Sequence, residues 1–556
     1  MDTNSTSAAS GDHSTPEAKA DSPATARTAD AETAATARDD SEPTAEGDAN
    51  AESTAIPDDE RDALVTIAGG AVVTSGAFSA QRGLLTATEL VLTRGLGPAT
   101  YGVYALAWRI AQVLVRLVTF GSVPALQRFL PAAADDPARR SRVTGLAYAT
   151  TLGVGVSMAL GLWVAAPRVN ELTVSAPTFP PTMRLFGALV GLLGLVTVTA
   201  AVFRAIGSAR GEVLFNKLLR PAVRLVGAAG AVALGYSVVG VAGAIVACTL
   251  LLVAVGIPVS IRVTGIVPTL RGARGELRRF YDHAAPVAMS SLGKVFQNRI
   301  DVLLVGGLLT AVAAGVYNVV LVLITIAWIP LRSFNQLLPP VASKLYAADQ
   351  TATLNAVYSS VTRLIVTTVL PVLAVLGVYG EPLLAAFGPT YTRGYLPLVV
   401  YLGGVFVGSA VGATGWLLMM TDHQYARMAL DWLLAALNVG LTYAFVLRYG
   451  LVGAALGTSA AIAVQNGAQV VLLRRFEGLW PFDRTFLTPL AAGAVMIAIM
   501  GAVRVAVGGL AAVGIGAVAG TVGYLLALRA IGVDPRDRLV VGELVGSYLA
   551  AIDDWR

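Results

Sequence analysis

Apolar segments long enough to cross a bilayer recur along the chain from residue 66 to residue 530. A helix of about 20 apolar residues spans the hydrocarbon core, so each such segment predicts one transmembrane helix. The sequence therefore predicts an all-α polytopic membrane protein with about 14 transmembrane helices. Their expected ranges are 66–93, 101–123, 143–166, 183–206, 213–235, 238–261, 284–308, 313–338, 357–379, 395–419, 427–447, 451–473, 486–506 and 510–530.

The first twelve helices form an internal repeat with an offset of 213 residues. The tripeptide Gly-Val-Tyr at 102–104 recurs at 315–317, and the Tyr and Gly that bound 236–240 recur at the ends of 449–453. Two matches at one offset indicate parallel repeats of six spans each, because an even number of spans preserves orientation. We expect two pseudosymmetric six-helix lobes plus two extra C-terminal helices.

Polar residues lie in stripes on the first two helices of each repeat. Arg82 and Glu89 are seven residues apart on the first helix, as Lys294 and Asp301 are on the seventh. At about 100° per residue, residues three, four and seven apart share one face of a helix. These helices are expected to line one polar cavity, and its cavity-lining or ion-coupling residues are Glu89, Asp301, Gln297, Asn298 and Asn318.

The cationic residues of the stripes outnumber the acidic ones. Surplus positive charge in a cavity of low dielectric favours an anionic ligand, and the guanidinium fork suits phosphate especially well. Structural ion pairs, or side chains that reach the lipid headgroups, are the alternative explanation for the same residues. The candidate phosphate-binding residues are Arg82, Arg109, Arg116, Lys294 and Arg299.

Charge divides the chain into two very different parts. Residues 1–62 hold 16 acidic and 4 basic residues, whereas residues 63–556 hold 19 acidic and 36 basic residues. An acidic segment without periodic apolar residues is typical of a disordered tail. Basic residues concentrate in the loops that share a side with the amino terminus, which predicts a cell-membrane protein with both termini cytoplasmic.

These features define the expected domain boundaries. They are a disordered acidic cytoplasmic tail (1–62), an N-terminal six-helix lobe (63–262), a basic cytoplasmic linker (263–280), a C-terminal six-helix lobe (281–475), and two additional helices with the C-terminal tail (476–556).

The sequence contains no motif of a known catalytic or cofactor site. It has one cysteine, Cys248, and three histidines, and it carries neither a Walker loop nor a Gly-x-Ser-x-Gly or His-Glu-x-x-His motif. We therefore expect no enzyme activity, no catalytic residues, no cofactor and no metal. Nucleic acid is not an expected partner.

The segment Leu96-Gly97-Pro98 with the Gly-Val-Tyr tripeptide, followed by Arg109, resembles the start of the polysaccharide-biosynthesis flippases. These are the O-antigen and exopolysaccharide repeat-unit translocases of the multidrug/oligosaccharidyl-lipid/polysaccharide exporter superfamily. The stretch 301–317 and Pro339-Pro340 resemble their second lobe. The resemblance implies alternating access and a polyprenyl or dolichyl phosphate or pyrophosphate oligosaccharide as the substrate. Membrane lipids and a proton or sodium ion are the other implied partners.

Two other functions are compatible with the same pattern. A cation-coupled multidrug exporter would need a net acidic cavity for cationic drugs, and the surplus of arginine disfavours it. A non-transporting scaffold of a glycan-assembly complex would have no use for charge inside the membrane. Glu89 and Asp301 depart from a purely cationic cavity, and they either couple transport to an ion or balance the arginines.

Overall fold

The computed structural model describes residues 61, 79–297, 300–335 and 338–532, and every regular element within these ranges is helical. Apart from Arg61, the predicted acidic tail lies outside the described residues, as do Asn298, Arg299 and the start of the first predicted helix. Nine described helices are long and apolar enough to cross a membrane by length and composition, and α11 is a shorter apolar helix. The chain is thus an all-α multi-pass membrane protein.

The first lobe contains the helix at 79–96 and the elements up to residue 264. Within it α5 packs against α2, α4 and α8, and α7 packs against α8. Its labelled elements are α2 (Pro98–Val118), α3 (Ser122–Phe129), η2 (Pro131–Ala133), α4 (Pro137–Glu171), α5 (Phe179–Ala205), α6 (Ala209–Glu212), the π-helical η3 (Val213–Leu219), α7 (Arg220–Ala233) and α8 (Val238–Thr264).

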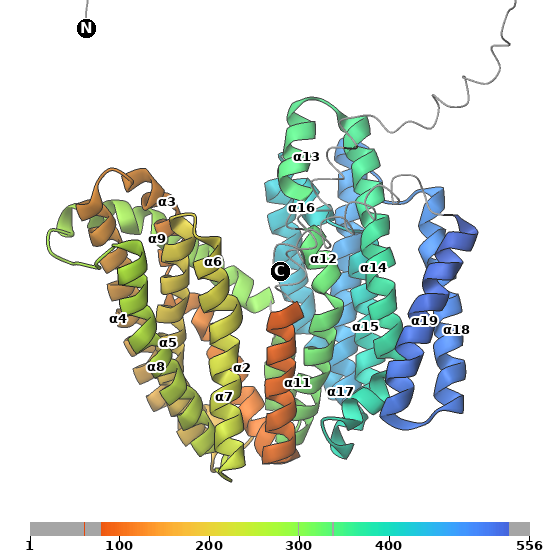
Figure 1. Cartoon of the computed structure of the whole chain (residues 1–556), viewed down its shortest axis with the longest axis horizontal. Helices are drawn as coiled ribbons and strands as arrows, with labels where there is room; N and C mark the ends of the chain where they lie inside the picture. Colours follow the sequence, from red (N-terminus) through yellow and green to blue (C-terminus); the bar gives the residue numbers. More distant parts are fainter. Residues whose placement is uncertain (1–60, 62–78, 298–299, 336–337, 533–556) are drawn as a thin grey trace, which may run out of the picture. The chain divides into compact units, whose positions relative to one another are not determined.

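The second lobe follows with α15 packed between α14 and α17, and with α11 against α15. The additional helices α18 and α19 pack against each other and against α14 (Figure 1). The elements are α9 (Arg274–Gln297), α10 (Ile300–Leu308), α11 (Ala311–Ala327), α12 (Ile329–Phe334), α13 (Leu338–Ala347), α14 (Thr351–Ala385), η4 (Pro389–Gly394), α15 (Tyr395–Ala410), α16 (Thr414–Met420), α17 (Gln424–Glu477), η5 (Arg484–Phe486), α18 (Leu487–Ala506) and α19 (Gly509–Ile531).

The helix boundaries confirm the 213-residue repeat. Shifted by 213 residues, the start of α2 falls on the first residue of α11, and both ends of α4 fall within one residue of those of α14. The end of α8 falls on the end of α17, and each is followed by a left-handed glycine, Gly265 or Gly478. Only glycine adopts this conformation without steric cost, so the two lobes end their sixth helix with the same cap.

Several predicted helices are broken where the sequence contains turn residues. The predicted helix 313–338 is divided after α11, and Pro330 opens the short α12. The predicted helix 395–419 is divided at Gly412, which has a φ of 64°. The predicted helices 427–447 and 451–473 are separate, as expected, because α17 consists of two helices that meet at Gly450, where φ is 58° and ψ is −130°. Proline and glycine set these breaks because neither supports an uninterrupted helix.

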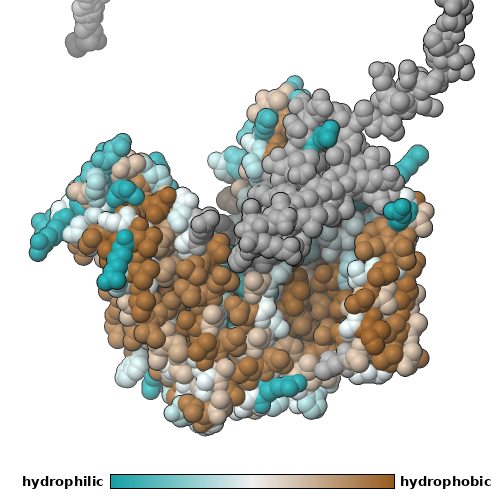
Figure 2. Space-filling model, viewed as in Figure 1, coloured by the Kyte–Doolittle hydropathy of each residue, from teal (hydrophilic) through white to brown (hydrophobic). Residues whose placement is uncertain are grey.

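The outer surfaces of the helices are apolar. Figure 2 shows hydrophobic side chains over the sides of both helix groups, with polar residues gathered at the helix ends. Val164 on α4 and Val505 on α18 are 72% and 90% exposed, respectively. Such surfaces are favourable against lipid tails and unfavourable against water, as expected for a membrane protein.

Candidate functional site

A buried ion pair forms the centre of the candidate site. Arg224 Nη2 lies 2.6 Å from Glu89 Oε1, and the two side chains are only 6% and 4% exposed. Arg224 Nε also donates to the Tyr104 hydroxyl over 3.0 Å, and its guanidinium lies 3.9 Å from the centre of the Trp108 ring. The charge of Arg224 is therefore balanced by a carboxylate and further stabilised by aromatic faces.

A chain of hydrogen bonds extends from this ion pair into the second lobe. The Tyr101 hydroxyl donates to Glu89 Oε2 over 2.8 Å, and Asn318 Nδ2 donates to the Tyr101 oxygen over 2.6 Å. Arg109 Nε in turn donates to Asn318 Oδ1 over 2.7 Å. Because Asn318 lies on α11 and the others belong to the first lobe, this network joins the two lobes through buried polar contacts.

The network borders a narrow cavity with a volume of about 40 Å³. A cavity of that size has room for about one to three water molecules. Arg82 is half-buried, whereas Arg109 and Arg224 are buried. The lining residues are Arg82, Leu85, Thr86, Glu89, Trp108, Arg109, Gln112, Arg224, Val322 and Thr325.

The corresponding acid of the second lobe has a different environment. Asp301 is 2% exposed and accepts hydrogen bonds from the Tyr317 hydroxyl over 3.0 Å and from the Val302 amide over 2.9 Å. The backbones of Lys294 and Gln297 belong to α9, but their side chains are not among those that the structure describes. Among the described contacts, Asp301 is bound by neutral donors, unlike Glu89.

Of the six predicted residues whose side chains are described, the structure brings four together. Arg82, Glu89 and Arg109 line one cavity, and Asn318 is bonded to Arg109. Arg116 is exposed at the end of α2 and does not line that cavity. The described lining comes from the first helix, α2, α7 and α11. The sequence did not predict a contribution from α7, and the predicted polar stripe 294–298 lies where no side chains are described.

Arg224 lines the candidate site but is not among the site residues expected from the sequence. Arg224 and Arg363 belong to the basic stretches that the positive-inside rule assigns to the cytoplasmic side, but both are buried in the structure. Arg363 pairs with Asp483 over 2.5 Å. The signal was available, because Arg224 lies well inside the predicted helix 213–235, where a charge is costly unless it faces protein or water.

Together the fold and the site define a multi-pass membrane protein of two repeated lobes with a charged cavity between helices of both. The family model described as "Polysaccharide biosynthesis protein" matches residues 91–397, which is more than half of the chain. The chain belongs to this family, and the resemblance seen in the sequence is confirmed. No curated protein matches the sequence.

Solved structures of transporters share the fold. The lipid II flippase MurJ, in an inward closed conformation, has a TM-score of 0.67 at 12% identity, with 82% of this chain and 98% of that chain covered. An inward-facing multidrug resistance MATE family transporter of the MOP superfamily has a TM-score of 0.62 at 16% identity, with 73% and 98% covered. A MOP superfamily transporter from Pyrococcus furiosus, described as having a binding pocket of reverse polarity, has a TM-score of 0.51 at 16% identity, with 75% and 96% covered. These are transporters and not enzymes, in agreement with the sequence-based expectation.

Proposed function

We propose that this protein is a flippase that moves a lipid-linked oligosaccharide, carried on a polyprenyl or dolichyl phosphate or pyrophosphate, across the cell membrane. The observation that supports this most is the charge of the cavity, whose described lining holds three arginines, Arg82, Arg109 and Arg224, and one acid, Glu89. The net positive charge suits a phosphate-bearing substrate. Membership of a polysaccharide biosynthesis family supports the same substrate class.

The narrowness of the cavity implies how such a substrate is handled. About 40 Å³ cannot hold a sugar phosphate, so the lobes must separate before the substrate reaches the arginines. The bonds from Asn318 to Arg109 and Tyr101 would then break. In this proposal the polar network closes the pathway on one side, and movement of the lobes alternately exposes the cavity to the two faces of the membrane.

The proposed orientation places both termini in the cytoplasm. The basic residues that remain at exposed helix ends, such as those of α9, support it through the positive-inside rule. The boundaries proposed from the sequence for the tail, the lobes and the linker are retained as part of this proposal. Lys294 and Arg299 of the second lobe are proposed to complete the phosphate site from sequence position alone.

A cation-coupled multidrug exporter is the second candidate, and the fold shared with MATE transporters favours it. It would require an acidic cavity, whereas the arginines outnumber Glu89 here. A deletion strain separates the two: loss of a flippase leaves lipid-linked glycan on the inner leaflet, whereas loss of an exporter raises drug sensitivity. If the lipid-linked pool is unchanged, a non-transporting scaffold remains possible. Transport shown directly would exclude it.

Replacing Arg82 with Ala should slow flipping of a fluorescent lipid-linked oligosaccharide in proteoliposomes. Loss of one charge-assisted contact to phosphate should weaken substrate binding by about 2–3 kcal/mol. Lys294→Ala should have a similar effect. Arg168→Ala is the matched control, because that side chain is 83% exposed and pairs with Glu171 within α4. If Arg82→Ala and Lys294→Ala both insert normally and flip the substrate at the wild-type rate, these two positions do not recognise the phosphate.

Asp301→Asn should reduce the dependence of transport on an imposed proton or sodium gradient. The described contacts of Asp301 are neutral donors, so its carboxylate is the better candidate for ion coupling. Glu89 is bound to Arg224, and its charge is better explained by balance with that arginine. Transport would be measured in vesicles with and without each gradient for wild type, Asp301→Asn and Glu89→Gln. Identical gradient dependence in all three would assign both acids to charge balance.

A further inference from the structure

A second basic cavity lies at one end of the first lobe and shares no residue with the candidate site. It has a volume of about 480 Å³, within the range typical of small-ligand pockets. It lies where α3 and α9 come together at the same end of the molecule (Figure 1). Its lining residues are Arg128, Phe129, Ala132, Arg139, Arg279, Asp282 and His283.

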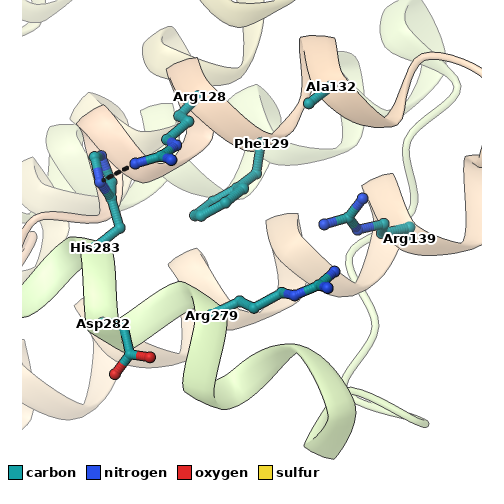
Figure 3. A pocket seen from close by; sticks show the side chains of 7 residues that line it. All are labelled: Arg128, Phe129, Ala132, Arg139, Arg279, Asp282 and His283. Atoms are coloured by element: carbon teal, nitrogen blue, oxygen red, sulfur yellow. Dashed lines mark hydrogen bonds between the residues drawn. The ribbon is translucent and has the colours of Figure 1, made fainter. Parts of the chain in front are cut away.

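The side chains are arranged so that positive charge faces the cavity. Figure 3 shows the guanidinium groups of Arg128, Arg139 and Arg279 around the Phe129 ring, whereas the carboxylate of Asp282 points away from them. An Asp282 carboxylate oxygen instead lies 3.8 Å from Nε of the exposed Arg278, one turn earlier on α9. The one acid described in the lining therefore does not pair with Arg128 or Arg279, while Arg139 is paired with Glu276 outside the lining.

The histidine holds one of the arginines in place. Arg128 Nη1 lies 3.0 Å from His283 Nδ1. A guanidinium has no acceptor, so Nδ1 must accept this bond, and the neutral ring then carries its proton on Nε2. Arg139 is anchored from behind by Glu276, with Nε 3.1 Å from Oε1. The cavity is thus lined by guanidinium groups from three separate segments, α3, α4 and α9, and by the His283 ring.

We propose that this cavity binds the phosphate or pyrophosphate group of a lipid at that surface of the membrane. Several arginines converging on one pocket match the geometry of phosphate oxygens, which accept paired hydrogen bonds. The lining comes from the end of α3, from η2, from the start of α4 and from the first three turns of α9. These segments lie at one end of the first lobe, where a lipid headgroup would lie. Lipid binding at this cavity can be measured without transport, so it is independent of whether the protein is a flippase.

A neighbouring apolar groove supports a lipid as the source of the phosphate. The same turns of α9 that carry Arg279 and His283 also carry Leu277 and Tyr281, which line a groove of about 800 Å³. Most of its other lining is apolar, including Leu146, Met158 and Leu270. One helix end thus borders both a site for a charged headgroup and a site for a hydrocarbon chain.

The test is ligand binding to the purified full-length protein in detergent, measured by calorimetry. The probes are dioctanoyl phosphatidic acid, inorganic pyrophosphate, and dioctanoyl phosphatidylcholine as a lipid whose headgroup has no net charge. The variant Arg128→Gln with Arg279→Gln should weaken phosphatidic acid binding about a hundredfold, since each charge-assisted contact contributes about tenfold or more. Arg274→Gln is the matched control on the same helix, because Arg274 is exposed and outside the cavity.

Tight phosphatidic acid binding that is lost in the double variant and retained in Arg274→Gln supports the proposal. Equal affinity for inorganic pyrophosphate would overturn a lipid as the source and leave the free anion as the ligand. Binding that is unchanged in the double variant, or equally strong for phosphatidylcholine, would overturn the site. A Leu277→Asn variant that binds pyrophosphate normally and phosphatidic acid weakly would assign the hydrocarbon chain to the groove.

Discussion

Replacing Arg224 with Met should destabilise the protein by about 3–5 kcal/mol, the range for removing one partner of a buried ion pair. Both Arg224 and Glu89 are nearly inaccessible, so the variant leaves the carboxylate of Glu89 without its cation in a dry environment. Tyr101 would still donate to Glu89, but one neutral hydrogen bond does not balance a buried charge. A lower melting temperature of the detergent-purified protein is the expected result.

A double-mutant cycle makes this expectation specific. Glu89→Gln alone leaves Arg224 unbalanced, whereas the double variant removes both charges together. We therefore expect the double variant to be more stable than the sum of the two single losses predicts. Arg220→Met is a control one turn earlier on α7, where the only side-chain hydrogen bond described is a long one of 3.5 Å to Asn216. Additive losses in the cycle would show that the two charges do not stabilise each other.

The repeat could be predicted from the sequence because it depends on local features. The Gly-Val-Tyr tripeptide and the spacing of 213 residues are visible in the printed sequence, and the helix boundaries follow the same spacing. Helix length and hydropathy require no knowledge of tertiary contacts. The break at Gly450 was predicted, whereas those at Pro330 and Gly412 were not, because the apolar segments 313–338 and 395–419 look continuous in the sequence.

The partners within the candidate site could not be predicted in the same way. The stripe of Arg82 and Glu89 was visible, but which cation reaches Glu89 depends on how α7 packs beside the first helix. Arg224 is 135 residues away from Glu89 in the chain, and helical periodicity says nothing about such a contact. The bond between Arg109 and Asn318 likewise depends on how the lobes meet.

The glycine of the repeated Gly-Val-Tyr tripeptide lies where the two lobes touch, and the close packing there explains why it is a glycine. Gly102 on α2 and Gly315 on α11 occupy equivalent positions and pack against each other: a Cβ on Gly315 would lie 3.2 Å from Gly102 Cα. A Cβ on Gly102 would lie 1.8 Å from the Ala311 carbonyl oxygen. Because that oxygen belongs to the backbone of α11, it cannot rotate away as a side chain can, and the helices must separate.

Gly102→Ala should therefore disrupt the contact between the lobes, at a cost of about 3 kcal/mol, the upper end of the usual range for overpacking. Gly315→Ala should be milder, since its nearest neighbour is the Tyr101 ring at 3.1 Å. Gly161→Ala on α4 is the control, because a Cβ there meets nothing within 4 Å.

The separation of the lobes can be measured at a second contact between them, where Arg94 Nε donates to the Ala386 carbonyl over 2.8 Å. Cysteines introduced at Arg94 and Ala386, with Cys248 replaced by Ser, should be joined by a short bifunctional thiol reagent in the otherwise wild-type protein. Gly102→Ala should lower the cross-linking yield because α2 and α11 move apart, and Gly161→Ala should leave it unchanged. If Gly102→Ala retained both the wild-type yield and the wild-type melting temperature, α2 and α11 would not require glycine at this crossing, and the repeated glycine would need another explanation.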